Sequence, residues 1–149
     1  MILPVTRGLT VLALLVLAGC AAHVSKPDAL PAAAANIDWS AAKTVTVKMT
    51  DFDFTPAKIS FAAAQPVKLV LSNDGTDVHD FSAPAFFAAS SLRQGSTGPA
   101  GGKVSLAKGK SAEIDLVPGA AGTYPLTCTE FLHDMFGMTG TITVTAASH

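Results

Sequence analysis

The chain has 149 residues, of which 49% are hydrophobic and 14% are charged, and its formal net charge at pH 7 is −1. This length allows one domain of ordinary size. Because the sequence contains no stripe of basic residues and no polybasic segment, it excludes the typical nucleic-acid binder and the protein that reaches membranes through surface charge.

The first twenty residues have the pattern of an export signal. One positive charge at Arg7 precedes an apolar run over residues 9–17, which is too short to span a bilayer as a helix. Small residues then lead to Cys20, so residues 1–19 are predicted to be a secretory signal peptide. The sequence Leu-Ala-Gly-Cys that ends at Cys20 resembles the lipobox of bacterial lipoproteins. This resemblance implies that Cys20 is lipidated and becomes the mature N-terminus; the alternative is simple cleavage that leaves a free Cys20.

The lipidated N-terminus is followed by a stretch without a periodic apolar face. Residues 20–42 are rich in alanine and contain two prolines, so they are predicted to form a flexible tether in front of a domain over residues 43–146. An exported domain lies where free thiols tend to oxidise. With Cys20 lipidated, Cys128 has no partner within the chain, and such a lone thiol is expected to be buried, catalytic or bound to metal.

Within the domain, short segments alternate between apolar and polar residues, which predicts β-strands. The first of them continues through Asp-Phe-Asp-Phe at 51–54, with Phe52 and Phe54 in alternation. The predicted strands cover residues 44–54, 58–61, 67–72, 78–81, 103–107, 111–117, 123–128 and 139–145. Seven or eight short strands separated by Gly, Pro, Asn and Asp turns predict an all-β, antiparallel sandwich or barrel.

One segment lacks this alternation. Residues 84–93 begin with an alanine-rich, phenylalanine-containing sequence and are predicted to form a short helix. Phe86, Phe87 and Leu92 are expected to face the core, and a glycine-rich loop follows.

Residues with metal-binding side chains occur at the ends of predicted strands. Cys128 ends one strand, and the loop after it can bring His133 and Met138 back toward the sulfur. His79 lies at the end of another presumed strand and is the second histidine of the domain; the two remaining histidines lie in the tether and at the last residue. One thiolate, two imidazoles and one weak axial thioether are the ligand set of a mononuclear blue-copper site.

Residues 44–145 resemble a cupredoxin, the plastocyanin/azurin type of blue copper protein, in two parts. The stretch that ends in Val-His-Asp-Phe at 78–81 resembles the N-terminal half of bacterial single-domain members. The pattern Tyr-x₃-Cys-x₄-His-x₄-Met-x-Gly-x-Ile-x-Val at 124–144 resembles their C-terminal ligand loop. The resemblance implies an antiparallel Greek-key β-sandwich of seven or eight strands, with the short helix in an inserted segment at 83–102.

The resemblance also implies a role for each site residue. His79, Cys128 and His133 correspond to the equatorial ligands of one copper ion per domain, which cycles between Cu(I) and Cu(II). Met138 corresponds to the axial ligand. Asp80 occupies the position at which many members have an Asn or Asp that ties the two ligand loops together.

The ligand loop also departs from the family pattern. Glu-Phe-Leu at 130–132 replaces the Pro-Gly that related proteins often have before the histidine, and it places Glu130 near the metal. Glu130 is therefore an alternative axial carboxylate. Met135, in the same loop, is a rival to Met138 as the axial ligand. Core packing alone would also account for Met138.

The favoured function is one-electron transfer, and the alternative is a periplasmic copper chaperone, storage or resistance protein. An enzyme is not expected, because the pair Cys128 and His133 has no recognisable oxyanion element or third catalytic partner. Phe131 and Phe136 are expected either to form a hydrophobic docking patch around His133 or to pack within the loop.

The expected partners are redox proteins of the periplasm or the membrane, and nucleic acid is not expected to bind. The protein is expected to be a monomer, exported by a bacterium and anchored through its lipid to the periplasm-facing side of the inner or outer membrane.

Overall fold

The computed structural model describes residues 37–96 and 98–147, so the predicted signal peptide, Cys20 and the tether up to residue 36 lie outside the described residues. The described part forms ten strands, one short α-helix and one 3₁₀ turn. In chain order the elements are η2 (Trp39–Ala41), β1 (Lys43–Thr50), β2 (Asp53–Thr55), β3 (Lys58–Ala62), β4 (Val67–Asn73), β5 (His79–Ser82), α1 (Pro84–Ala88), β6 (Ser90–Leu92), β7 (Lys103–Leu106), β8 (Ser111–Pro118), β9 (Gly122–Thr127) and β10 (Thr139–Thr145).

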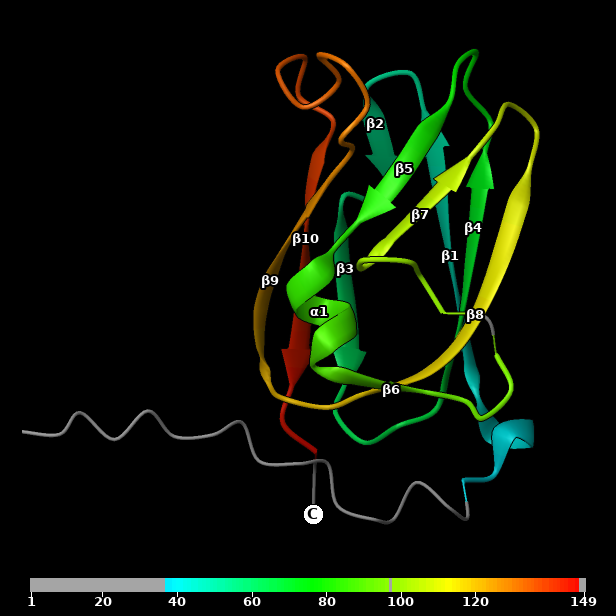
Figure 1. Cartoon of the computed structure of the whole chain (residues 1–149). Helices are drawn as coiled ribbons and strands as arrows, with labels where there is room; N and C mark the ends of the chain where they lie inside the picture. The colour runs from blue at the N-terminus through cyan, green and yellow to red at the C-terminus, as the bar shows by residue number, and fades with distance from the viewer. Residues whose placement is uncertain (1–36, 97, 148–149) are drawn as a thin grey trace, which may run out of the picture.

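The strands form two five-stranded sheets, with the orders β2-β1-β4-β8-β6 and β3-β10-β9-β5-β7 (Figure 1). The prediction of an all-β sandwich with a short helix in the inserted segment is confirmed. The strand number exceeds the expected seven or eight for two reasons. A turn separates β1 from β2 within the first predicted strand, and β6 occupies the second half of the predicted helix.

Most neighbouring strands are antiparallel, but β1 pairs with β4 and β3 pairs with β10 in parallel. β2 runs antiparallel to β1, β3 points in the same direction as β2 but lies in the other sheet, and the chain reverses once more between β3 and β4 (Figure 1). The chain therefore runs in the direction of β1 again when it enters β4. Alternation along a strand reveals its buried face but not its partner, so the expectation of purely antiparallel sheets is corrected to mixed ones.

Two predicted segments differ in detail from the structure. Residues 51–52 form a turn in which Phe52 has φ 65° and is 44% exposed, so this side chain does not alternate into the core. Phe86 and Phe87 of α1 are buried as predicted. Leu92 is 39% exposed, contrary to the prediction, because it belongs to the edge strand β6 and not to a core-facing helix.

The core lies between the two sheets and consists mainly of large aliphatic and aromatic side chains. The largest fully buried ones are Phe54, Phe81, Phe86, Met49, Ile59, Leu69, Leu71, Leu116, Leu126, Met138, Ile142 and His79. Burying one such apolar side chain stabilises the fold by about 1.5–3 kcal/mol. Cys128 and Met138 belong to the same buried cluster, so the core is continuous with the end of the sandwich at which they lie.

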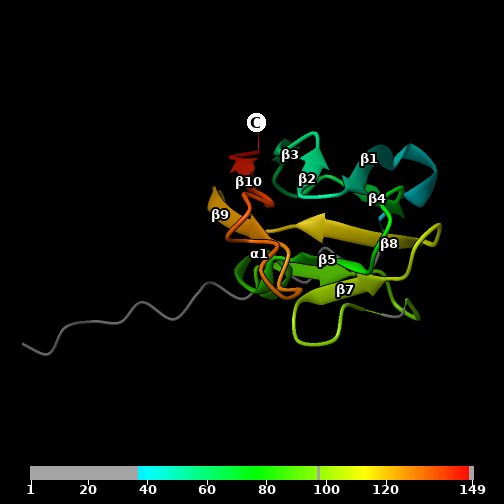
Figure 2. The ribbon, with the colours of Figure 1, turned by 90° about the horizontal axis from the view of Figure 1, so that it is seen from above.

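The two ends of the sandwich differ. The β1–β2 turn, the β4–β5 loop and the β9–β10 loop gather at the upper end in Figure 1, whereas η2 and the end of β10 lie at the lower end. Viewed from above, the β9–β10 loop lies over the strand ends on the side of β9 and β10 (Figure 2). In the described part of the chain, no helix has both the length and the apolar character that crossing a membrane requires.

Candidate metal centre

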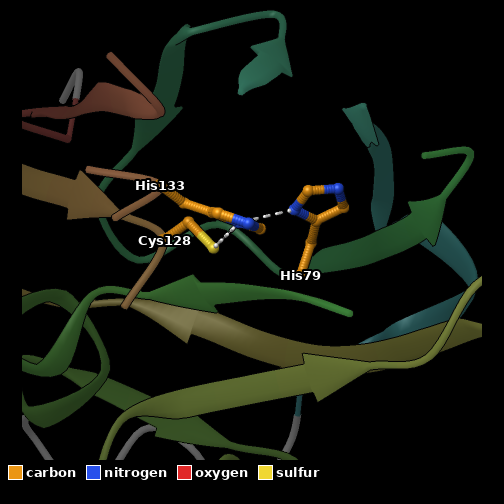
Figure 3. Close-up of side chains that lie close together, drawn as sticks. All are labelled: His79, Cys128 and His133. Carbon is orange, nitrogen blue, oxygen red and sulfur yellow. Dashed lines mark hydrogen bonds between the residues drawn. The ribbon is translucent and has the colours of Figure 1, made fainter. Parts of the chain in front are cut away.

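Three side chains that are far apart in the sequence converge at the upper end of the sandwich. His79 begins β5, Cys128 directly follows β9, and His133 lies in the β9–β10 loop (Figure 3). The Nδ1 atoms of His79 and His133 are 3.2 Å apart, and the Cys128 sulfur is 3.5 Å from His133 Nδ1. One ligand atom from each residue lies within 4.8 Å of the others.

Neighbouring strands explain why these residues meet. β5 and β9 pair in one sheet, with Ser82 opposite Thr127, so the start of β5 and the end of β9 reach the same end of the sandwich. The backbone N–H of Asp80 donates to the Cys128 sulfur at 3.4 Å. Cys128 is fully buried and His79 is 1% exposed, so water is excluded from two of the three candidate ligands.

The β9–β10 loop closes on itself through Met138. The Cys128 N–H donates to the Met138 carbonyl at 3.1 Å, and the Met138 N–H donates to the His133 carbonyl at 3.0 Å. The loop turns through positive φ angles at Leu132 (65°) and at Gly137 (98°). These contacts hold the backbone of all three predicted loop ligands together.

The side chain of Asp80 links the two segments that carry Cys128 and His79. Its carboxylate accepts hydrogen bonds from the Thr129 N–H at 2.9 Å and from the Thr129 hydroxyl at 2.7 Å. Lys103 Nζ lies 3.5 Å from the same carboxylate. The residue after His79 is therefore bound to the residue after Cys128.

Asn73 holds the loop that precedes His79. Its side-chain amide donates to the carbonyls of Asp77 and Leu106, both at 2.8 Å, and its side-chain oxygen accepts from the Gly75 N–H at 3.0 Å. Asn73 is fully buried, and these three bonds satisfy its amide. The β4–β5 loop thus delivers His79 to the centre in a fixed conformation.

Sequence reasoning missed two residues near the centre, both in the β1–β2 turn. The ring of Phe52 lies edge-on to that of His133, with centroids 5.2 Å apart. The carboxylate of Asp51 lies 3.2 Å from Nε2 of His79. The alternation at residues 51–54 predicts a strand. Nothing in this local pattern indicates that Asp51, which is 28 positions before His79, contacts the His79 ring.

Burial changes the acidity of the thiol. The loss of hydration raises the pKa of Cys128 above its ordinary value, and hydrogen bonds from the backbone N–H groups of Asp80 and Glu130 oppose this rise. A thiol binds metal as the thiolate. Burial therefore favours the neutral thiol, and a cation bound beside the two imidazoles has to displace the thiol proton.

The chemistry of the donors fits copper. One cysteine sulfur and two histidine nitrogens lie within 4.8 Å of one another, and a buried methionine ends the same loop. These donors match a trigonal His₂Cys site with a weak axial thioether. In the described ranges, this is the only group of at least three His, Cys, Asp or Glu side chains close enough to share a metal ion.

Comparison with known proteins gives the same result for the fold. Auracyanin from the photosynthetic bacterium Roseiflexus castenholzii, in a dithionite-reduced crystal structure, aligns with a TM-score of 0.54 and 18% identity over 70% of this chain and 98% of its own. Auracyanin B aligns with a TM-score of 0.52 and 25% identity over 70% of this chain and 89% of its own.

A larger protein shares the fold over part of its length. A multicopper oxidase from Campylobacter jejuni, described as a metallo-oxidase, aligns with a TM-score of 0.53 and 11% identity over 68% of this chain but only 30% of its own. A search of curated proteins gave no match.

The family assignment rests on the sequence match as well as on the fold. Residues 10–144 match the model of the family described as "Cupredoxin-like domain". This match spans most of the chain, and the sandwich carries its His-Cys-His cluster where β5 begins and β9 ends. The chain therefore belongs to the cupredoxin-like family, and copper is the cofactor that this family and this donor set imply.

Proposed function

We propose that the protein is a mononuclear type 1 copper protein that transfers single electrons. The observation that carries the proposal is the convergence of His79, Cys128 and His133 at one end of the sandwich. Copper bound there would supply a one-electron couple between Cu(I) and Cu(II). The surrounding residues bind and orient it, exclude water and limit rearrangement.

The packing of the ligands favours a site that changes little between oxidation states. His79 and Cys128 are buried, and each belongs to or adjoins a strand. Asp80 joins their segments through its hydrogen bonds to Thr129. Because both ligands are fixed by hydrogen bonds and core packing, they keep nearly the same positions when the charge of the ion changes. Small reorganisation is what rapid electron transfer needs.

Burial separates the candidates for the axial position. Met138 is 0% exposed, whereas Met135 is 77% exposed at the surface of the loop. Glu130 is half-buried, and a carboxylate would bring a further negative charge to the thiolate. We therefore assign the weak axial bond to Met138.

His133 provides the route by which electrons leave and enter. It is the least buried of the three ligand side chains, and exposed apolar side chains lie on its loop and on the β1–β2 turn beside it. These form what we call the apolar rim: Phe52, Phe131, Leu132, Met135 and Phe136. Because Phe131 is 86% and Phe136 is 65% exposed, neither packs within the loop, which favours a docking surface for redox partner proteins.

The proposed location is the periplasm-facing side of a bacterial membrane, with lipid on Cys20. The described end of the tether is compatible with this arrangement. η2 lies at the end of the sandwich opposite the metal centre (Figure 1). A lipid anchor that precedes η2 would leave the apolar rim free to face a partner.

The test is a visible and EPR spectrum of the Cu(II)-loaded protein beside Cys128→Ala. We expect an intense thiolate-to-copper charge-transfer band that reduces and reoxidises reversibly, and that is lost in Cys128→Ala. Cys20→Ala is the matched control and should keep the band. A protein that holds Cu(I) but gives no such band with Cu(II) would favour copper storage or delivery instead, and a spectrum unaffected by Cys128→Ala would refute the site.

A further inference from the structure

The ring of His79 has a second contact, on the side away from the metal centre. Figure 3 shows one ring nitrogen directed at His133 and the other directed away from it. That other atom, Nε2, lies 3.2 Å from the Asp51 carboxylate. An ionised carboxylate only accepts hydrogen bonds, so the hydrogen of neutral His79 lies on Nε2. Nδ1 then presents its lone pair to the cluster, as a metal ligand must.

The Asp51 carboxylate is itself held in place from the opposite loop. The Thr76 N–H donates to Oδ1 at 2.8 Å, and the Thr76 hydroxyl donates to Oδ2 at 2.9 Å. These bonds fix the orientation of Asp51, and a carboxylate carries a negative charge at neutral pH.

The chain leaves room for this contact at Gly75. A Cβ atom at that position would lie 2.5 Å from His79 Nε2 and 2.6 Å from Asp51 Oδ1. Its backbone does not have the positive φ that makes glycine necessary elsewhere. The close approach of the histidine and the carboxylate thus explains why residue 75 has no side chain.

The two carboxylates around the centre differ in their partners. Asp80, beside Cys128, lies close to the Lys103 ammonium group. Asp51 has only the His79 ring as an ion-pair partner among the described residues. The charge of Asp51 is therefore not offset by a lysine or arginine, and it acts on the metal through the imidazole.

We propose that Asp51 is a positioning residue of the metal centre, which fixes His79 with Nδ1 toward copper and lowers the reduction potential. The proposal rests on the proposed function for its electron-transfer role. A carboxylate that accepts from a ligating imidazole orients the ring and makes the ligand more basic, and such partners alter metal affinity strongly. The negative charge of Asp51, which lies on the far side of the His79 ring from the copper site, stabilises the doubly charged oxidised ion more than the singly charged reduced one.

The first test compares the reduction potentials of copper-loaded Asp51→Asn and Asp53→Asn. Asparagine keeps the shape and an acceptor oxygen but removes the charge. Asp53 is exposed on β2, two residues away, and the described part of the chain offers its side chain no hydrogen bond or ion pair. We expect Asp51→Asn to weaken Cu(II) binding relative to Cu(I) about tenfold, which is a rise of about 59 mV for a one-electron couple. Asp53→Asn should shift the potential much less, and equal shifts in the two variants would overturn the proposal.

The second test does not require reversible oxidation. In the diamagnetic Cu(I)-loaded protein, the Nε2–H proton of His79 should resonate far downfield because it is bound to a carboxylate. The resonance should move upfield in Asp51→Asn and stay in place in Asp53→Asn. An unchanged resonance in Asp51→Asn would overturn the proposal whether or not the protein carries electrons. A protein that shows the shift but cannot be cycled would instead refute electron transfer and leave the Asp51 contact established.

Discussion

Buried polar side chains gather around the metal centre. Only four polar or charged residues are buried in the described part of the chain, and three of them, Asn73, His79 and Asp80, supply a candidate ligand or hold its segment. Burying a polar group costs free energy unless its hydrogen bonds are made. The bonds of Asn73 and Asp80 join segments that carry candidate ligands. They therefore offset the cost of burying these side chains and also hold the ligand segments rigid.

Asp80 illustrates how one residue serves both the fold and the site. Its N–H donates to the Cys128 sulfur, and its carboxylate binds Thr129, the residue that follows the cysteine. The N–H dipole favours a negatively charged sulfur, whereas the nearby carboxylate charge disfavours it. Lys103 lies close enough to Asp80 to reduce this second effect.

The assignment of the axial ligand can be tested by one pair of conservative substitutions. Met138→Leu keeps a buried apolar side chain and should cost less than about 1.5 kcal/mol of stability. Because it removes a weak donor to the oxidised ion, it should raise the potential by about 59 mV or more, the equivalent of tenfold in relative affinity. Voltammetry of the exposed control Met135→Leu should give the wild-type potential. A shift in Met135→Leu alone would make Met135 the axial ligand.

At the scale of elements, three connections meet to form the centre. The β9–β10 loop supplies Cys128 and His133, and the β4–β5 loop leads into His79. The β1–β2 turn brings Asp51 against His79 and Phe52 against His133. None of these connections is close to the others in sequence, so the two sheets determine the geometry of the site by placing the strand ends.

The β4–β5 loop should depend on Asn73 for its conformation. Asn73→Ala leaves the buried carbonyl of Leu106 without its donor and releases the Asp77 carbonyl and the Gly75 N–H. We expect the free energy of unfolding of the metal-free protein to fall by about 1–3 kcal/mol, measured by chemical denaturation. Ser72→Ala, one residue earlier in β4, should change it by less than about 0.5 kcal/mol. Equal effects of the two substitutions would show that Asn73 does not hold the loop.

The sequence predicted the strands and the clustered ligands better than it predicted their surroundings. Strands such as β10 follow from alternation, because each has one face in the core. The parallel pairings do not, since they depend on where β3 changes sheets. The contact of Asp51 with His79 depends on the turn at 51–52, and the same Asp-Phe-Asp-Phe sequence alternates as a strand would. Both the parallel pairings and the contact of Asp51 with His79 depend on which distant segments of the chain lie side by side, and no local pattern encodes this.

At the scale of the molecule, the two ends of the sandwich have different surfaces. The large exposed apolar side chains of the described residues, except Leu92, belong to the β1–β2 turn, the β4–β5 loop and the β9–β10 loop. These three connections lie at the end of the sandwich opposite η2 (Figure 1), and the β9–β10 loop among them carries His133. Apolar surface of this kind around a redox centre lowers the cost of bringing two centres together, because docking removes it from water.

The apolar rim should therefore control the rate of electron exchange without controlling the potential. Phe131→Lys places a charge on the rim, and two such molecules that dock rim to rim bring like charges together. We expect electron self-exchange, measured by NMR line broadening in mixtures of reduced and oxidised protein, to slow about tenfold or more, which corresponds to about 1.4 kcal/mol. Leu92→Lys adds the same charge to β6, away from the centre, and should leave the rate near that of the wild type. The visible spectrum and potential of Phe131→Lys should match the wild type, because Phe131 is exposed and belongs to no candidate ligand contact among the described residues. Equal slowing in both variants would mean that net charge, not the apolar rim, governs the encounter.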